Sequence, residues 1–103
     1  MLNRQIIPPK LVGSTVTVAF NFTSDLAIGE TISSATCTCK VYSGTDASPG
    51  VLISGGATAS GAVVSQNIAG GVLGVLYELL CTITTSLGQT LLKSGYLAVV
   101  QDL

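Results

Sequence analysis

The clearest pattern in the chain is an alternation of apolar and polar residues with a period of two, which is typical of half-buried β-strands. It first appears in residues 14–23, where the expected inward face is Val16, Val18, Phe20 and Phe22. It returns in residues 31–42, where the expected inward face is Ala35, Cys37, Cys39 and Val41. The pattern therefore predicts two strands joined by a short link at residues 24–29.

The second half of the chain continues the pattern between glycine-rich segments. Short strands are expected at residues 51–54 and 62–68, separated by Gly55, Gly56 and Gly61. A long strand is expected at residues 75–85, with an inward face of Val75, Tyr77, Leu79, Cys81 and Ile83. A hairpin connection at residues 86–89 joins it to a last strand at residues 90–100. Residues 43–50 are rich in turn-forming residues and are expected to form an exposed loop.

Six or seven short β segments, with no stretch of helical period, predict an all-β fold. The expected architecture is an immunoglobulin-like antiparallel β-sandwich of about seven strands, formed by residues 13–103. Tyr77 supports it, because it follows a glycine-rich corner, as in domains where such a tyrosine hydroxyl bonds to the backbone of the corner. Cys81 follows Tyr77 by four residues rather than the two of the immunoglobulin signature, so only the corner is matched.

The N-terminal residues 1–12 differ from the rest of the chain. They contain two of the four basic residues and the adjacent prolines Pro8 and Pro9, which fix an extended conformation. We therefore expect an extended arm outside the sandwich core. Because the prolines already restrict the unfolded chain, the arm would lose little entropy on reaching a neighbouring molecule. The predicted partner-binding residues are Arg4, Ile6, Ile7, Pro8, Pro9 and Lys10.

Charge is scarce: the 103 residues include four basic and five acidic side chains, where an average domain of this length has about 26 charges. A net charge of −1 provides no basic surface, so nucleic-acid binding is not expected. On the strands, the charges are expected at isolated outward positions such as Lys40 and Glu78. Charged side chains at sheet edges usually prevent strand-to-strand association, and neutral edges lack them. The composition therefore predicts a surface that is buried against copies of the chain or other partners.

The composition excludes most catalytic chemistry. Without histidine, there are no Ser-His-Asp or Cys-His sites and no His-containing zinc site. Asp25 and Glu30 form only a weak candidate for a calcium loop, and three cysteines leave a zinc ion one ligand short. We predict no catalytic residue, metal site, cofactor or small-molecule substrate, and the protein is not expected to be an enzyme.

The cysteines leave two interpretations open. Cys37 or Cys39 faces Cys81 across the sandwich and forms a disulfide, or all three are buried thiols that pack as small hydrophobic side chains. An odd number of cysteines and the lack of a signal-peptide pattern at the N-terminus favour a reducing compartment. The longest apolar stretch, residues 68–80, is too short to span a bilayer, so no membrane partner is expected.

Three segments carry a resemblance to a known family. They are Phe20 to Ile32 with its Ser24-Asp25-Leu26-Ala27 run, Val41-Tyr42-Ser43-Gly44-Thr45-Asp46-Ala47-Ser48-Pro49, and Thr82 to Thr90 with its Gly88-Gln89-Thr90 end. Together they resemble a family of small tailed-phage virion proteins, often labelled phage fiber-tail adaptor, over residues 14–100. The resemblance implies an immunoglobulin-like module that helps to build the phage particle at the tail or neck. It also implies a location in the virion after synthesis in the host cytoplasm.

The resemblance and the charge-poor surface together predict a non-enzymatic structural protein that joins fibers to the particle, in contact with other virion proteins and with copies of itself. One alternative is a capsid decoration protein, which would occur in many more copies. Another is a module that binds a host glycan or surface protein. For that role Tyr42 and Tyr96 are the candidate anchors, because the other three aromatic residues are expected in the core.

Overall fold

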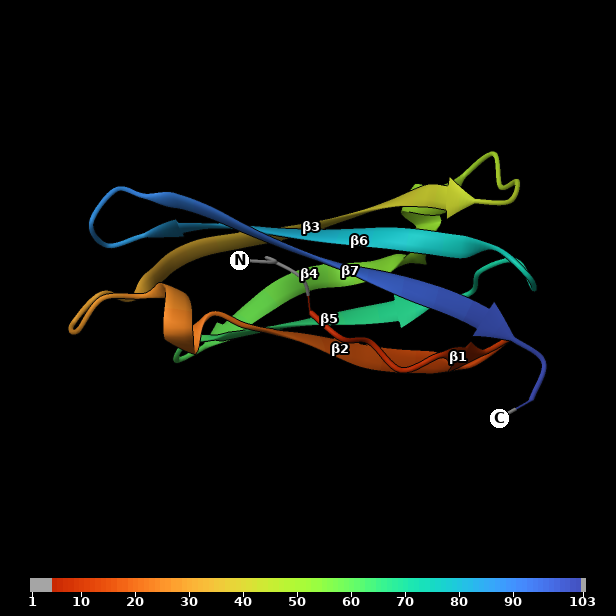
Figure 1. Cartoon of the computed structure of the whole chain (residues 1–103), viewed down its shortest axis with the longest axis horizontal. Helices are drawn as coiled ribbons and strands as arrows, with labels where there is room; N and C mark the ends of the chain where they lie inside the picture. Colours follow the sequence, from red (N-terminus) through yellow and green to blue (C-terminus); the bar gives the residue numbers. More distant parts are fainter. Residues whose placement is uncertain (1–4, 103) are drawn as a thin grey trace.

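The computed structural model describes residues 5–102, which form two β-sheets packed face to face (Figure 1). In the view of Figure 1, strands β3, β6 and β7 make the upper layer, and β2, β4 and β5 make the lower layer. The strands are β1 (Lys10–Leu11), β2 (Thr15–Asn21), β3 (Ile32–Ser43), β4 (Ile53–Ser60), β5 (Val63–Ala69), β6 (Leu76–Thr85) and β7 (Thr90–Val100). The predicted all-β sandwich of about seven strands is confirmed.

The strand order follows the immunoglobulin scheme. One sheet has the order β2-β5-β4, which corresponds to strands B, E and D, and β3, β6 and β7 correspond to strands C, F and G. These pairs are all antiparallel, whereas β1 pairs in parallel with β7. In the described part of the chain no strand pairs with the other edge of β2, where strand A of the scheme would lie.

The core sits between the two sheets and is built from the inward faces that the alternation predicts. Strand β6 lies inside its sheet, and its inward residues Tyr77, Leu79, Cys81 and Ile83 are at most 1% exposed. From the opposite sheet, Phe20, Val64 and Ile68 meet them. The inward face of β3 is only half-buried, because β3 is the edge strand of its sheet.

Two local predictions are wrong. Residues 51 and 52 do not begin a strand, because they belong to the 3-10 helix η2 (Pro49–Leu52); a second 3-10 helix, η1 (Thr23–Asp25), follows β2. Pro49 starts η2 with a φ that suits a helix. Gly55 and Gly56 do not separate strands either. They lie inside β4 at an irregularity between Ser54 and Thr58, and the positive φ of Gly55, 76°, is one that glycine adopts readily.

Residues 5–11, here called the N-terminal segment, lie against the sandwich. The Gln5 N–H donates to the Ser94 carbonyl over 2.6 Å, and Lys10 and Leu11 pair with Val99 and Val100. Ile7 packs against the core, and Lys10 is only 1% exposed. The expectation that this segment lies outside the core is therefore wrong for Ile7 and Lys10. The division of the chain at residue 12 stays a prediction.

Candidate functional site

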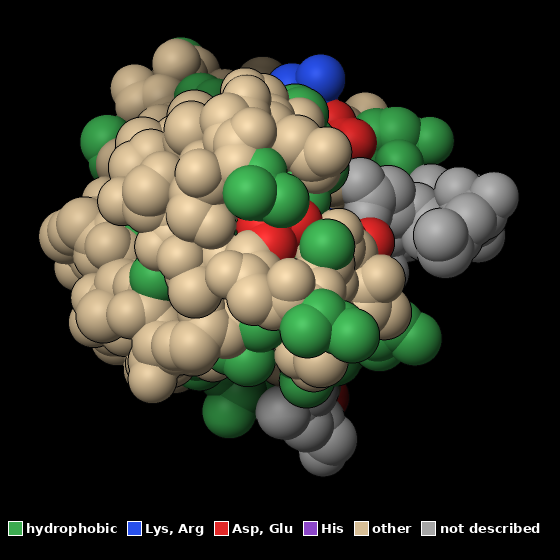
Figure 2. Space-filling view, turned by 90° about the vertical axis from the view of Figure 1, so that its left-hand side faces the viewer, with side chains coloured by type: hydrophobic (Ala, Val, Ile, Leu, Met, Phe, Trp, Pro, Cys, Tyr) green, Lys and Arg blue, Asp and Glu red, His purple; other side chains and the backbone are tan. Residues whose placement is uncertain are grey.

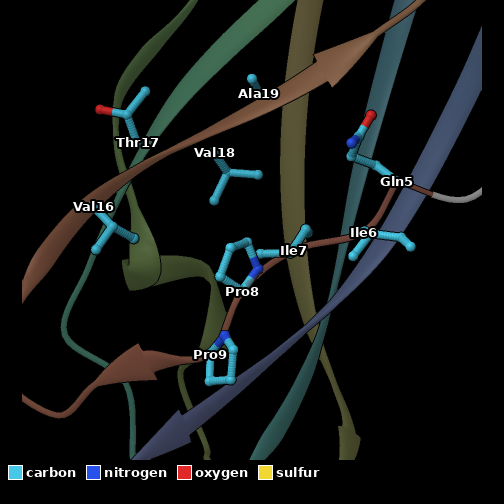
Figure 3. Close-up of a pocket in the computed structure, with 9 residues that line it drawn as sticks. All are labelled: Gln5, Ile6, Ile7, Pro8, Pro9, Val16, Thr17, Val18 and Ala19. Carbon is cyan, nitrogen blue, oxygen red and sulfur yellow. The ribbon is translucent and has the colours of Figure 1, made fainter. Parts of the chain in front are cut away.

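The N-terminal segment and strand β2 enclose a groove of about 340 Å³. Its lining is mostly aliphatic and consists of Gln5, Ile6, Ile7, Pro8 and Pro9 on one wall and Val16, Thr17, Val18 and Ala19 on the other. Figure 3 shows Val18 pointing from β2 toward Ile7 and Pro8, while Thr17 points away from them. The groove is thus a short apolar channel along the edge of a sheet.

The groove exists because the N-terminal segment does not pair with β2 as a strand. Pro8 and Pro9 have no N–H to contribute to a ladder. The hydrogen bond that joins the segment to β2 comes instead from the Asn21 N–H, which donates to the Gln5 Oε1 over 3.1 Å. Among residues 5–102, β2 pairs with β5 on one side and with no strand on the other, so backbone groups of that other edge can pair with a further extended segment.

The structure brings together four of the predicted partner-binding residues, Ile6, Ile7, Pro8 and Pro9. Ile6 is 87% exposed, Pro8 and Pro9 are exposed, and Ile7 is half-buried. Lys10 is buried with its Nζ donating to the Leu11 carbonyl over 3.1 Å, and burial lowers its pKa. Arg4 lies outside the described residues. That these residues bind a partner stays a prediction.

Sequence reasoning missed the β2 wall of the groove. The alternation assigned Val16 and Val18 to the core, and Val18 is indeed buried, but Val16 is only half-buried beside the N-terminal segment. The two prolines were the available signal. Two adjacent residues without N–H groups, in a segment that lies beside an edge strand, leave a gap where a paired strand would close it.

The two acidic residues of the candidate calcium loop, Asp25 and Glu30, bind other side chains and backbone groups of the fold. Glu30 accepts hydrogen bonds from the Thr85 hydroxyl (2.5 Å) and the Ala27 N–H (2.9 Å), which lower its pKa, the Thr85 bond more strongly. Asp25 pairs with Lys93, with 2.8 Å between Oδ2 and Nζ. Within residues 5–102 no group of three or more potential metal-binding side chains comes together.

The predicted tyrosine corner is confirmed. The Tyr77 hydroxyl accepts a hydrogen bond from the Val72 N–H (2.8 Å) and donates one to Asp46 Oδ2 (2.7 Å). The pKa of Tyr77 is raised, mainly by burial. The pKa of Asp46 is lowered by its hydrogen bonds, most by the one from the Ser48 N–H and less by the one from the Tyr77 hydroxyl. Asp46 is half-buried, so the connection after β3 is attached to β6 at this point rather than fully exposed.

All three cysteines are free thiols. Cys37 and Cys81 lie opposite each other on the neighbouring strands β3 and β6, so the expected approach across the sandwich is wrong because both belong to one sheet. Cys81 is buried and the other two are half-buried, in agreement with packing as small hydrophobic side chains. Burial and the nearby Asp46 raise the pKa of Cys39 to about 11.

The two tyrosines outside the core contact each other. The rings of Tyr42 and Tyr96 are 4.6 Å apart between centroids and tilted by 55°, and Tyr42 is 61% exposed. Beside them, Lys40 and Glu78 form an ion pair with 3.1 Å between Nζ and Oε1, so these charges are not isolated as expected. Glycan binding by Tyr42 and Tyr96 stays a prediction.

A family model described as podophage GP4 fiber-tail adaptor protein gp77 matches residues 10–98. The chain belongs to this family. The match confirms the resemblance seen in the sequence and extends it at the N-terminal side to include β1. Comparison with curated proteins finds no match, and comparison with solved structures finds none either.

Membership of the fiber-tail adaptor family identifies the chain as a phage structural protein and a virion component. The matched range includes the β2 wall of the groove, whereas residues 5–9 of the other wall precede it. Between residues 5 and 102, no helix is long and apolar enough to cross a membrane.

Proposed function

We propose that the protein is a non-enzymatic adaptor that joins fibers to the tail or neck of a tailed phage particle, and that it contacts other virion proteins and copies of itself. The observation that carries this proposal is the fiber-tail adaptor family match over residues 10–98. Synthesis in the host cytoplasm and assembly into the virion follow from the same role.

We propose that the groove between β2 and the N-terminal segment receives an extended segment of a neighbouring virion protein. Three features support this use: an edge of β2 that pairs with no strand of residues 5–102, the aliphatic lining, and the exposed Ile6 at the rim. An extended segment satisfies backbone groups of an edge strand by adding a strand, and its side chains fill pockets at alternate positions. The arm residues Ile6 to Pro9 would then contact the partner directly.

The distribution of charge supports a role inside an assembly. Lys93, Asp25, Glu30 and Asp46 bind other groups of the fold, and Lys10 is buried. Figure 2 shows the end of the sandwich that carries the β2–β3 connection and the β6–β7 hairpin. The surface there is mainly neutral, with separate hydrophobic side chains. A neutral surface of this kind avoids the desolvation of unpaired charges when it is covered by another protein.

The proposal is tested by particles of the encoding phage that lack this chain. We expect quantitative mass spectrometry to find fiber proteins strongly reduced in the purified particles, while the capsid proteins keep their proportions. Wild-type particles should contain the chain in a small copy number compatible with tail or neck symmetry. Unchanged fiber content without the chain would overturn the adaptor role, and a copy number near that of the capsid protein would favour the decoration alternative.

A further inference from the structure

Cys37 and Cys81 occupy directly opposite positions on two neighbouring strands. The register of β3 and β6 pairs Cys37 with Cys81. Opposite residues of an antiparallel pair have Cα atoms about 4.5 to 5.5 Å apart, within the range of about 4.4 to 6.8 Å that disulfides span. The backbone of this sheet therefore already holds the pair within disulfide reach.

The alternative pairing of Cys39 with Cys81 is not offered by the sheet. Cys39 lies opposite Leu79, which makes Cys81 its diagonal neighbour. Diagonal Cα atoms are about 7 to 8 Å apart, beyond the distance that a disulfide bridges without backbone movement. The register thus distinguishes two pairings that the sequence leaves open.

The surroundings of the two thiols also set an order of reaction. Cys37 is half-buried on the edge strand β3, whereas Cys81 is fully buried in the core. The hydrogen bond with Cys81 lowers the pKa of Cys37, while that bond and burial raise the pKa of Cys81. The oxidant reaches Cys37 more easily because Cys37 is more exposed. Cys37 also forms the attacking thiolate more readily, so it reacts first.

We propose that Cys37 and Cys81 form a disulfide when the protein meets a small disulfide oxidant such as oxidised glutathione. The Cys37 thiolate attacks one sulfur of the oxidant, forms a mixed disulfide and releases one glutathione thiolate. The Cys81 thiolate then attacks the Cys37 sulfur, forms the protein disulfide and releases the second glutathione. Two protein thiols are oxidised, the oxidant is reduced to two thiols, and the two cysteine protons end on glutathione.

The disulfide would attach the edge strand β3 covalently to β6, which lies inside the sheet. A cross-link between residues far apart in sequence restricts the unfolded chain and stabilises the fold. Exposure to such oxidants follows when a particle leaves the reducing cytoplasm, so the timing of the reaction rests on the proposed virion function. The reaction itself depends on the register of the two strands and on the access of the oxidant to Cys37, not on the proposed function.

The test compares the purified full chain with and without excess oxidised glutathione under native conditions. We expect the number of free thiols to fall from three to one. After alkylation of the remaining thiol and proteolysis, mass spectrometry should find a peptide that contains Cys37 linked by a disulfide to a peptide that contains Cys81. The midpoint of thermal unfolding should rise by about 10 °C and return to its original value with a reductant. Three remaining thiols after oxidation would overturn the proposal.

Two matched serine variants make the assignment specific. Cys39→Ser should form the same disulfide with the same rise in the unfolding midpoint, because Cys39 takes no part. Cys37→Ser should form no intramolecular disulfide and show no rise. A disulfide that persists in Cys37→Ser, or disappears in Cys39→Ser, would overturn the pairing.

Purified extracellular particles separate this inference from the proposed function. A disulfide-bonded chain in particles supports both. A fully reduced chain in particles would overturn the timing of the reaction and leave the adaptor role intact. Absence of the chain from particles would overturn the adaptor role. The disulfide reaction would still be decided separately, by the number of free thiols in the oxidised purified chain.

Discussion

Tyr77 and Asp46 are joined by a hydrogen bond in which the Tyr77 hydroxyl donates to Asp46 Oδ2 over 2.7 Å. The same hydroxyl accepts a hydrogen bond from the Val72 N–H. Tyr77 belongs to β6, Asp46 follows β3, and Val72 lies in the glycine-rich corner before β6. One buried hydroxyl therefore fixes two connections at the same end of the sandwich.

Removing that hydroxyl should destabilise the fold. Tyr77→Phe keeps the buried ring but leaves the Val72 N–H and the Asp46 carboxylate without this partner. We expect the free energy of unfolding in urea to fall by about 1 to 3 kcal/mol. Tyr42→Phe is the matched control, since its ring is largely exposed, and it should change stability by less than about 0.5 kcal/mol. Equal effects of the two variants would contradict the role of the Tyr77 hydroxyl.

Glu30 should contribute to the loss of stability in acid. Its hydrogen bonds lower its pKa from the ordinary value of 4.5. The unfolded chain therefore binds the proton more readily than the folded one, and the stabilisation is present above the unfolded pKa and lost as the pH falls through the folded pKa. Urea unfolding between about pH 6 and about pH 3 should show a smaller loss of stability for Glu30→Gln than for the parent chain.

A second variant checks the cause of this pH dependence. Thr85→Val removes the hydroxyl that donates to Glu30, so it should also reduce the loss of stability in acid. Part of the loss should remain in both variants, because Asp46 has a lowered pKa as well. Acid profiles of both variants that match the parent would show that Glu30 is not a source of the effect.

The ion pairs Lys93–Asp25 and Lys40–Glu78 should differ in their contribution to stability. The side chains of Lys93 and Asp25 are 12% and 19% exposed, and the Lys93 Nζ also lies 5.4 Å from the centre of the Phe22 ring. Lys93→Met leaves a largely buried carboxylate unpaired and should cost about 3 kcal/mol in urea unfolding. Lys40→Met is the matched control, because Lys40 is 74% exposed in its pair with Glu78, and should cost less than about 1 kcal/mol. The reverse order would contradict this assignment.

Gly95 should be required for the N-terminal segment to lie against β7. A Cβ atom at Gly95 would come within 2.7 Å of the Gln5 carbonyl oxygen and would also meet the Ile7 side chain. Gly95→Ala should therefore displace residues 5–7 and make the Gln5 amide, which bonds to Ser94, exchange its hydrogen at least about tenfold faster. Gly50→Ala is the control, since a Cβ there meets nothing within 4 Å. Unchanged exchange in Gly95→Ala would contradict this packing.

The alternation of residue types was sufficient to predict strands β2, β3, β5, β6 and β7 and the core residues on them, but not β1 or the extent of β4. Inward residues such as Phe20 and Tyr77 follow directly from the period of two, and the glycine-rich corner before Tyr77 indicated the hydrogen bond that the structure contains. Local patterns carry this information because side chains of a strand point to opposite faces of the sheet in turn.

The candidate site could be predicted only in part, because it depends on contacts between distant residues. The two prolines indicated an extended segment, but its position follows from the space above Gly95 and from the pairing of Lys10 with Val99. Likewise, the proximity of Cys37 to Cys81 follows from the register of two strands, which the alternation alone does not determine.

The most direct test of the adaptor role is a reconstruction of the phage particle by electron cryomicroscopy. We predict density for this two-sheet sandwich at the tail or neck, between the tail and the fibers, with an extended segment of a neighbouring protein along β2 and residues Ile6 to Pro9. Density for the sandwich on the capsid surface away from the tail, or no density for it in a particle that carries its fibers, would contradict the account.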